Sequence, residues 1–182
     1  MHLSPLFMRV GLRMMKKLLV LDYKDYTEDL PVYEKETVRA IIRKDDKLAM
    51  QQSDIGEYKI LGGVVEDGET HLETLLREVE EEAGMFVKPD SLQLIGVIEE
   101  KRLDVFHKNQ IYHCLTYFYG CDVKAHMIPL KLTPCEVAKG YKLVWETPEQ
   151  IVKRNRTLIK EKWKLRDTEF INLLLEGKID DQ

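Results

Sequence analysis

The residues best suited to chemistry in this chain are three carboxylates on one face of an expected helix. Apolar residues recur at helical spacing between residues 71 and 84, and Gly84 is a good stop signal, so we predict a helix there. Glu78, Glu81 and Glu82 then occupy positions i, i+3 and i+4, which lie about 5–6 Å apart on a helix surface. We expect Glu82 to stand nearest the apolar side of this helix and Glu81 to stand furthest from it.

Such a carboxylate cluster either faces solvent or holds a cation. Each like-charged neighbouring pair costs a helix roughly 0.2–0.5 kcal/mol, and a solvated acidic face is the usual explanation of a charge run. Ligands that offer only oxygen, with no His or Cys nearby, would favour a hard ion such as Mg²⁺ or Mn²⁺. Ca²⁺ fits less well, because the chain has no loop of alternating Asp and Asn ligands.

The segments around this helix alternate between expected strands and helices. An acidic loop at 64–69 precedes the helix, and Thr147-Pro148 opens a second helix as cap and first-turn proline. Strands are expected at 37–43, 48–52, 58–61, 92–106, 110–120 and 143–146, and a helical pattern covers 157–176. Strands mixed with a few helices predict an α+β or α/β fold, in which helices pack on the faces of a mixed β-sheet.

Length and composition limit the remaining classes of protein. The 182 residues suit one domain, and 44% of them are hydrophobic, which is enough for a sizeable core. With 28 Lys and Arg against 32 Asp and Glu, the net charge is −4, so the chain lacks the basic field of a dedicated nucleic-acid-binding protein. Three dispersed cysteines without a CxxC pair indicate reduced thiols rather than a disulfide framework.

Residues 1–35 are interpreted as an N-terminal extension that contains a strand or precedes a later true start. Met14 and Met15 leave open that translation begins there. The longest uninterrupted apolar run in this region, residues 18–21, is too short for a signal-peptide core or a membrane span. We therefore expect a cytoplasmic protein that binds neither membrane nor nucleic acid.

A wider pattern gives the carboxylates a second interpretation. Gly63, then five residues, Glu69, then seven residues, lead into Arg77-Glu78-Val79-Glu80-Glu81-Glu82-Ala83-Gly84-Met85. This arrangement resembles the Nudix box, G-x5-E-x7-R-E-U-x-E-E-x-G-U with U apolar, and every specified position matches. A chance match has odds on the order of one in ten million at background residue usage. The chain is therefore identified as a member of the Nudix hydrolase family.

The resemblance implies a fold and an activity. Residues 36–155 would form a Nudix-type α/β/α sandwich around a mixed sheet, and 156–182 would add a C-terminal helix packed on the same domain. The activity would be that of a pyrophosphohydrolase, in which water attacks a diphosphate linked to another moiety with the help of Mg²⁺ or Mn²⁺.

The resemblance also assigns roles to individual residues. Metal ligands would be Glu78, Glu81, Glu82 and the backbone carbonyl of Gly62. Glu69 would pair with Arg77 and so orient the carboxylate face. One departure is Leu61, which stands where the family usually has a proline before the two glycines. The absence of the proline is expected to loosen the loop entry but not to remove activity.

One more carboxylate is a candidate outside the box. Related enzymes use an additional Glu, in a loop before a late strand, to bind metal or to activate water. Glu136, in the segment Leu132-Thr133-Pro134-Cys135-Glu136 ahead of the strand at 143–146, is the best match. An ordinary exposed loop Glu is an equally good explanation of this residue.

Three functional readings stay open at this point. The leading one is hydrolysis of a nucleoside diphosphate derivative, most readily a modified nucleoside triphosphate, with ADP-ribose or a nucleotide sugar as the alternative substrate. A reading from another class is a regulator that binds nucleotides without turnover, although this chain retains every box carboxylate. The oligomeric state is open, and the N-terminal segment and C-terminal helix could support a homodimer.

Overall fold

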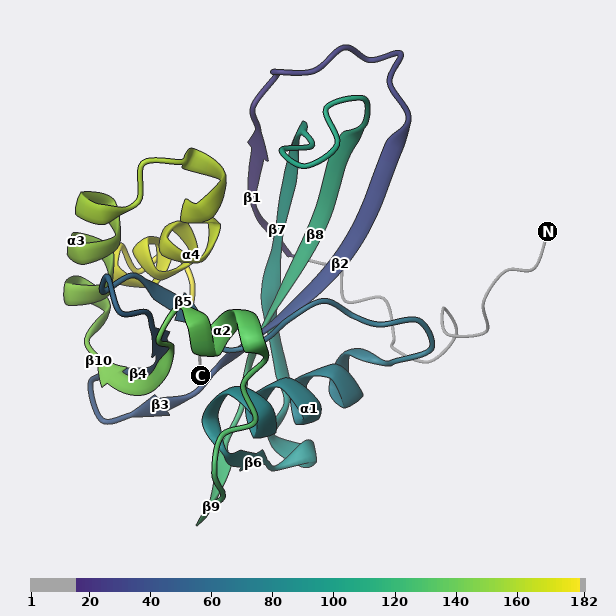
Figure 1. Ribbon diagram of the computed structural model, residues 1–182. Helices are drawn as coiled ribbons and strands as arrows, with labels where there is room; N and C mark the ends of the chain where they lie inside the picture. The colour runs from purple at the N-terminus through teal and green to yellow at the C-terminus, as the bar shows by residue number, and fades with distance from the viewer. Residues whose placement is uncertain (1–15, 181–182) are drawn as a thin grey trace.

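The largest sheet holds four strands in the order β1-β7-β8-β2 in the computed structural model, which describes residues 16–180 (Figure 1). Its members are β1 (Lys17–Asp22), β2 (Val32–Ile41), β7 (Gln93–Leu103) and β8 (Ile111–Gly120). The central pair β7 and β8 is antiparallel, whereas β1 and β2 run parallel to their neighbours. The sheet is therefore mixed, as the sequence predicts.

A second, smaller sheet has the order β10-β4-β3, with β5 also paired to β4. Its strands are β3 (Arg43–Lys44), β4 (Lys47–Gln52), β5 (Tyr58–Ile60) and β10 (Lys142–Glu146), and a separate two-stranded sheet joins β6 (Met85–Val87) to β9 (Val123–Met127). Isolated bridges connect Leu61 to Ala40 and Val64 to Thr37. The segment that carries Gly62 and Gly63, referred to below as the glycine pair, is thus hydrogen-bonded along β2.

The longest helix, α1 (His71–Ala83), follows this segment. Thr70 and Glu73 form a reciprocal capping box at its start, and Gly84 ends it in the left-handed conformation at φ 64°. The other helices are α2 (Pro134–Ala138), α3 (Pro148–Leu158) and α4 (Arg166–Leu175), with short 3₁₀ turns at Pro89–Ser91 and Lys162–Leu165. The helices predicted at 71–84 and from Pro148 are both present.

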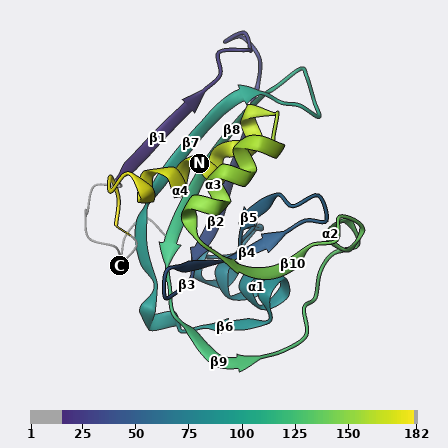
Figure 2. The same cartoon turned by 90° about the vertical axis from the view of Figure 1, so that its left-hand side faces the viewer.

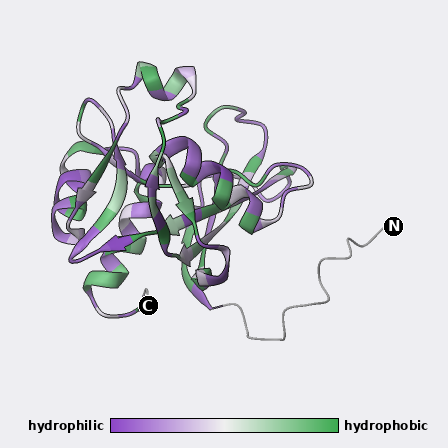
Figure 3. Cartoon of the chain, turned by 90° about the horizontal axis from the view of Figure 1, so that it is seen from below, coloured by the Kyte–Doolittle hydropathy of each residue, from purple (hydrophilic) through white to green (hydrophobic). Residues whose placement is uncertain are grey.

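Two hydrophobic clusters place helices on opposite faces of the strands. Strand β4 alternates its side chains, so that Ala49 joins the cluster containing α1, while Leu48 and Met50 join the cluster containing α3 and α4. Figure 2 shows α3 and α4 on one side and α1 on the other, and Figure 3 shows hydrophobic and hydrophilic residues mixed along strands and helices alike. The predicted arrangement, helices packed on both faces of a mixed sheet, is confirmed.

Several boundaries differ from the sequence expectation. The long strands end at Leu103 and begin at Ile111, so the turn between them is longer than expected. The helical pattern at 157–176 is divided among α3, a 3₁₀ turn and α4, because Ile159 takes up extended backbone and buries its side chain. Strands β6 and β9 and helix α2 were not expected at all.

The region assigned as an extension contributes to the main sheet. Within 1–35, β1 pairs with β7, and the first part of β2 pairs with β8. The alternative starts at Met14 and Met15 lie outside the residues that the structure describes. Among residues 16–180, no helix has the length and apolar character needed to cross a bilayer.

The C-terminal helix is attached to the sheet by a stacked aromatic pair, which yields a stability prediction. Phe118 on β8 and Phe170 on α4 are both fully buried, with ring centroids 3.9 Å apart. Phe170→Ala should lower the free energy of unfolding by about 3–5 kcal/mol, because it opens a cavity in the core. Phe106→Ala is the matched control, since Phe106 is 80% exposed, and should change stability by under about 0.5 kcal/mol. Denaturant titrations of the two variants decide the matter: equal midpoints would show that α4 does not depend on this pair.

Candidate active site

Gly62 and Gly63 bring the backbone unusually close to β2 and to α1. A Cβ on Gly63 would overlap the carboxylate of Glu78, and a Cβ on Gly62, whose φ is 129°, would overlap the Val38 carbonyl. Gly62 therefore requires glycine for both space and backbone conformation, whereas a side chain at Gly63 would displace the Glu78 carboxylate. The Gly62-Gly63 segment passes directly between β2 and the acidic face of α1.

An ion pair holds the loop before α1 against the helix. Arg77 Nε lies 2.7 Å from one oxygen of Glu69, and Arg77 Nη2 lies 2.8 Å from the other. The Thr74 hydroxyl also donates to Glu69, at 2.8 Å. Hydrogen bonding from Arg77 holds the pKa of Glu69 down to about 2. The Glu69–Arg77 pair expected from the sequence is thus formed, with two parallel hydrogen bonds.

The same guanidinium also reaches two of the helix carboxylates. Arg77 Nη1 donates to Glu78 at 2.7 Å and lies 3.7 Å from Glu81. Burial raises the pKa of Glu81, with Arg77 opposing that effect and Glu78 adding to it. Arg77 therefore connects the loop carboxylate to the carboxylates of the helix face.

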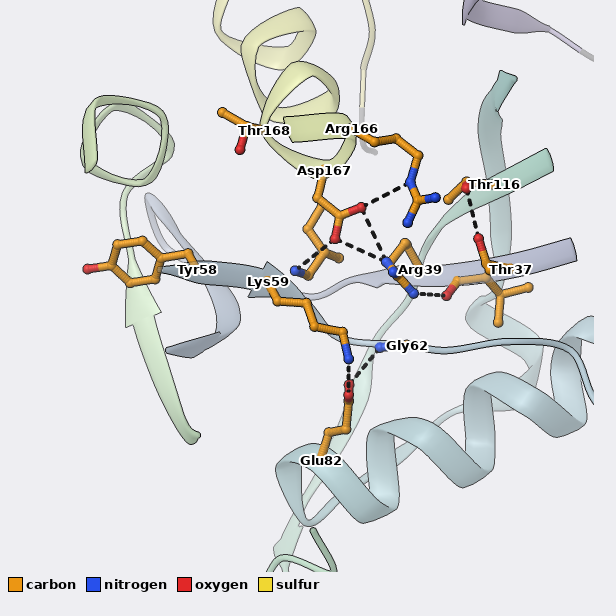
Figure 4. A network of polar contacts seen from close by, with 12 residues as sticks. Thr37, Arg39, Tyr58, Lys59, Gly62, Glu82, Thr116, Arg166, Asp167 and Thr168 are labelled. Atoms are coloured by element: carbon orange, nitrogen blue, oxygen red, sulfur yellow. Dashed lines mark hydrogen bonds and ion pairs between the residues drawn. The ribbon is translucent and has the colours of Figure 1, made fainter. Parts of the chain in front are cut away.

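Glu82 is the buried member of the cluster, as the helical spacing predicts (Figure 4). Its side chain is 2% exposed, against 39% for Glu81. Lys59 Nζ lies 2.6 Å from one of its oxygens, and the Gly62 N–H donates to the other at 2.7 Å. Burial raises the pKa of Glu82 to about 7, although Lys59 and Gly62 both favour the ionised form.

Glu136 lies on a helix rather than in the loop that the sequence suggested. Pro134 begins α2, and Thr133 and Glu136 cap it reciprocally, which explains why these residues leave the loop conformation. The Glu136 side chain is only 19% exposed and lies 3.9 Å from Lys59 Nζ. Burial would raise the pKa of Glu136, but its hydrogen bonds from Thr133 and the charge of Lys59 outweigh burial and lower it. The structure thus brings Glu136 beside Glu82.

Lys59 is the residue of this site that the sequence reasoning missed. It stands between Glu82 and Glu136, at 2.6 Å and 3.9 Å. Its neighbours Tyr58 and Ile60 are both buried, so alternation along β5 sends Lys59 to the other face, toward α1. That alternation, just before the glycine pair, was the available signal.

The donor chemistry of this site suits a hard divalent cation. Glu78, Glu81, Glu82 and Glu136 offer carboxylate oxygens only, and the Glu78 carboxylate occupies a space that any side chain at Gly63 would fill. Among residues 16–180, no three His, Cys, Asp or Glu side chains lie close enough together to hold a metal ion in their present conformations. Arg77 and Lys59 instead bind these carboxylates, and Gly62 contacts Glu82 through its N–H.

A basic cleft shares Lys59 with the carboxylate site. It has a volume of about 470 Å³ and includes Lys59 in its wall. Five more cationic side chains line it, together with four aromatic ones: Arg39, Arg102, Lys139, Lys164 and Arg166, with Tyr58, Tyr112, Tyr141 and Trp163. Its acidic lining residues are fewer, namely Asp54, Glu57, Glu100 and Asp167. The cleft can therefore attract an anion that also carries a flat apolar part.

Comparison with known proteins places this geometry in a family. A NUDIX domain model matches residues 34–167. The dihydroneopterin triphosphate diphosphatase of Haemophilus influenzae is 26% identical over 119 residues, which span 62% of this chain and 72% of that protein. An uncharacterized Nudix hydrolase of Rhodococcus erythropolis is 32% identical over 92 residues, or 50% of this chain and 46% of that protein.

Solved structures agree on the fold. A NUDIX hydrolase from Nitrosomonas europaea aligns with a TM-score of 0.59 at 20% sequence identity, covering 81% of this chain and 92% of the other. At that identity the likeness concerns the fold alone. With the family match extending over most of the chain, and with the complete box folded onto α1, the chain belongs to the Nudix hydrolase family.

Proposed function

We propose that this protein is a divalent-metal-dependent pyrophosphohydrolase that cleaves a nucleoside diphosphate derivative, with modified nucleoside triphosphates as its substrates. The observation that carries the proposal is the folded box: Arg77 joins Glu69 to Glu78 and Glu81, and Lys59, which contacts Glu82, also lines a basic cleft. A diphosphate carries dense negative charge, so its hydrolysis needs both a cation and fixed positive groups.

The roles of the residues follow from their contacts. A bound Mg²⁺ or Mn²⁺ would neutralise phosphate oxygens and make a water molecule easier to deprotonate. Glu78, Glu81 and Glu82 would hold the ion, and Arg77 would fix the orientation of the first two. Lys59, whose side chain is 31% exposed, would turn from Glu82 toward the phosphates in the cleft.

Glu136 is proposed as the group that accepts the proton of the attacking water. Its carboxylate is ionised at neutral pH, since its pKa is lowered, and it stands beside Glu82. Thr133 hydrogen-bonds one carboxylate oxygen at 2.9 Å through its N–H and at 2.8 Å through its hydroxyl, which restricts the rotation of the side chain. The second oxygen faces Lys59.

The proposed substrate class rests on the cleft and on one relative. The cleft offers cationic and aromatic groups together, which suits a phosphorylated molecule with a planar ring. The Haemophilus influenzae relative is named for a triphosphate substrate with such a ring system, dihydroneopterin triphosphate. A hydrolysis panel with Mg²⁺ should include nucleoside triphosphates, dihydroneopterin triphosphate, ADP-ribose and nucleotide sugars. Release of pyrophosphate and a monophosphate from a triphosphate is the expected outcome.

Metal dependence should be visible in both turnover and binding. Hydrolysis of the best panel substrate should stop in EDTA and return with Mg²⁺ or Mn²⁺. Glu82→Gln should reduce kcat by roughly 10²-fold or more and weaken Mn²⁺ binding, since a buried ligand charge is lost. Glu80→Gln is the matched control, because Glu80 lies on the same helix but pairs with Lys131, and its kcat should stay within about twofold. Undiminished turnover in chelator, or equal effects of the two variants, would contradict the metal assignment.

The proton-accepting role predicts a specific defect for Glu136. Glu136→Gln keeps the size of the side chain and one capping oxygen but removes the basic group, so kcat should fall by roughly 10²-fold or more. Mn²⁺ binding should change much less than in Glu82→Gln. Glu149→Gln, at an exposed first-turn position of α3, serves as the control. A loss of under about threefold would return Glu136 to a structural role as the cap of α2.

A further inference from the structure

A second cluster of buried charges lies at the wall of the same cleft, apart from the box carboxylates. Figure 4 shows three of its members, Arg39, Arg166 and Asp167. It contains three arginines but only two carboxylates, and we refer to it as the arginine cluster: Arg39, Arg102, Arg166, Glu100 and Asp167. Four of these residues are at most 7% exposed, and the side chain of Arg166 is 13% exposed. The cluster therefore holds one surplus positive charge at a nearly dry position.

The distances identify Arg166 as the surplus cation. Glu100 lies 2.7 Å from Arg102 but 3.3 Å from Arg166. Asp167 lies 3.1 Å from Arg39 but 3.5 Å from Arg166. Each carboxylate thus has a closer arginine, and neither depends on Arg166 for its neutralisation.

Arg166 also keeps an unused donor. Its Nε is buried and lies 3.5 Å from Asp167, but it forms no hydrogen bond within the described residues. Its Nη1 lies 3.3 Å from Glu100 and 3.8 Å from the Cys114 Sγ. A buried donor without a hydrogen-bond partner costs free energy, and Arg166 shares both of its carboxylate partners with a closer arginine. An anion that enters the cleft beside Arg166 would offer its guanidinium a further hydrogen-bond acceptor.

The surroundings of Arg166 are held in place before any ligand arrives. The guanidinium of Arg102 lies 4.1 Å from the ring centroid of Tyr112 and 5.1 Å from that of Trp163, so it is stacked between two aromatic rings. It donates to Glu100 and to the Leu103 carbonyl. Preorganised donors of this kind bind an oxyanion with little loss of side-chain freedom.

We propose that Arg166, supported by Arg102, binds a phosphate-type oxyanion at this wall of the cleft. Arginine suits the task because its planar fork matches two oxygens of a phosphate. As an anion site the cluster is independent of the proposed hydrolase activity. The role of the cluster as a substrate subsite rests on that activity. In that role the cluster would favour a substrate with a further negative group beyond the cleaved bond, such as a nucleoside triphosphate, over a nucleotide sugar whose sugar is uncharged.

Binding of inorganic phosphate to the metal-free protein tests the anion site without any turnover. In EDTA the box carboxylates repel phosphate, so calorimetric binding in the millimolar range reports on the cleft. Arg166→Gln should weaken phosphate binding by roughly tenfold or more, because it removes charge-assisted hydrogen bonds. Arg156→Gln is the matched control: Arg156 lies on α3, is half exposed and contacts only Glu169 among the residues described, so binding should stay within about twofold.

The Arg166→Gln variant should fold, because Glu100 and Asp167 each retain their closer arginine. Circular dichroism checks that it does. Arg166→Lys provides a second measurement: it keeps the charge but loses the fork, so phosphate should bind more weakly than in wild type and more tightly than in Arg166→Gln. Equal phosphate binding by wild type and Arg166→Gln, or none by wild type, would overturn the proposal. Phosphate binding that depends on Arg166 in a protein that hydrolyses no panel member would uphold the anion site and reject the proposed function.

Discussion

The close approach of the glycine pair to α1 is the constraint on which the rest of the site depends. On one side, the Leu61 and Gly63 carbonyls accept hydrogen bonds from Ala40 and Val38 of β2, both at 2.9 Å. On the other side, the Gly62 N–H binds Glu82. A side chain at Gly62 would clash with the backbone of β2, and one at Gly63 would displace the carboxylate of Glu78. The position of every carboxylate on α1 relative to the cleft follows from this contact.

Two cations that come from different directions contact the carboxylates of the candidate site. Arg77 lies on the helix itself and connects Glu69, Glu78 and Glu81. Lys59 comes from β5 and stands between Glu82 and Glu136. Clustered carboxylates would otherwise destabilise the helix, so these two cations allow the acidic face to exist before an ion binds. A divalent ion that binds these carboxylates must therefore compete with Arg77 and Lys59 for them.

The sequence best predicts the features that depend on residues close together in the chain. Helix α1, its stop at Gly84 and the Glu69–Arg77 pair depend on residues within about one helix length, and all three are present. The capping box of α2 is also local, and its Thr-Pro-x-Glu pattern at 133–136 was readable but was interpreted as a loop. Edge strands β6 and β9 are short and carry too few residues to show alternation.

The rest of the site could not be read from the sequence, because it joins residues far apart in the chain. Arg39 and Asp167 are separated by 128 positions, and Arg166 and Glu100 by 66. No pairing rule predicts which arginine meets which carboxylate across such distances. Lys59 is an intermediate case. Strand alternation indicates the face on which it lies, but only the packing of α1 and α2 places Glu82 and Glu136 beside it.

Helix α4 connects the core to the cleft, and this connection gives the C-terminal segment a role beyond covering the sheet. Phe170 fixes the helix by stacking on Phe118, and its first turn then delivers Arg166 and Asp167 to the cleft. Asp167 also accepts the Ile60 N–H at 3.3 Å, two residues before Gly62. The strand that leads into the glycine pair is therefore held by α4 on one side and by β4 on the other. A shift of α4 would move the arginine cluster and, through Ile60, the backbone that positions Glu82.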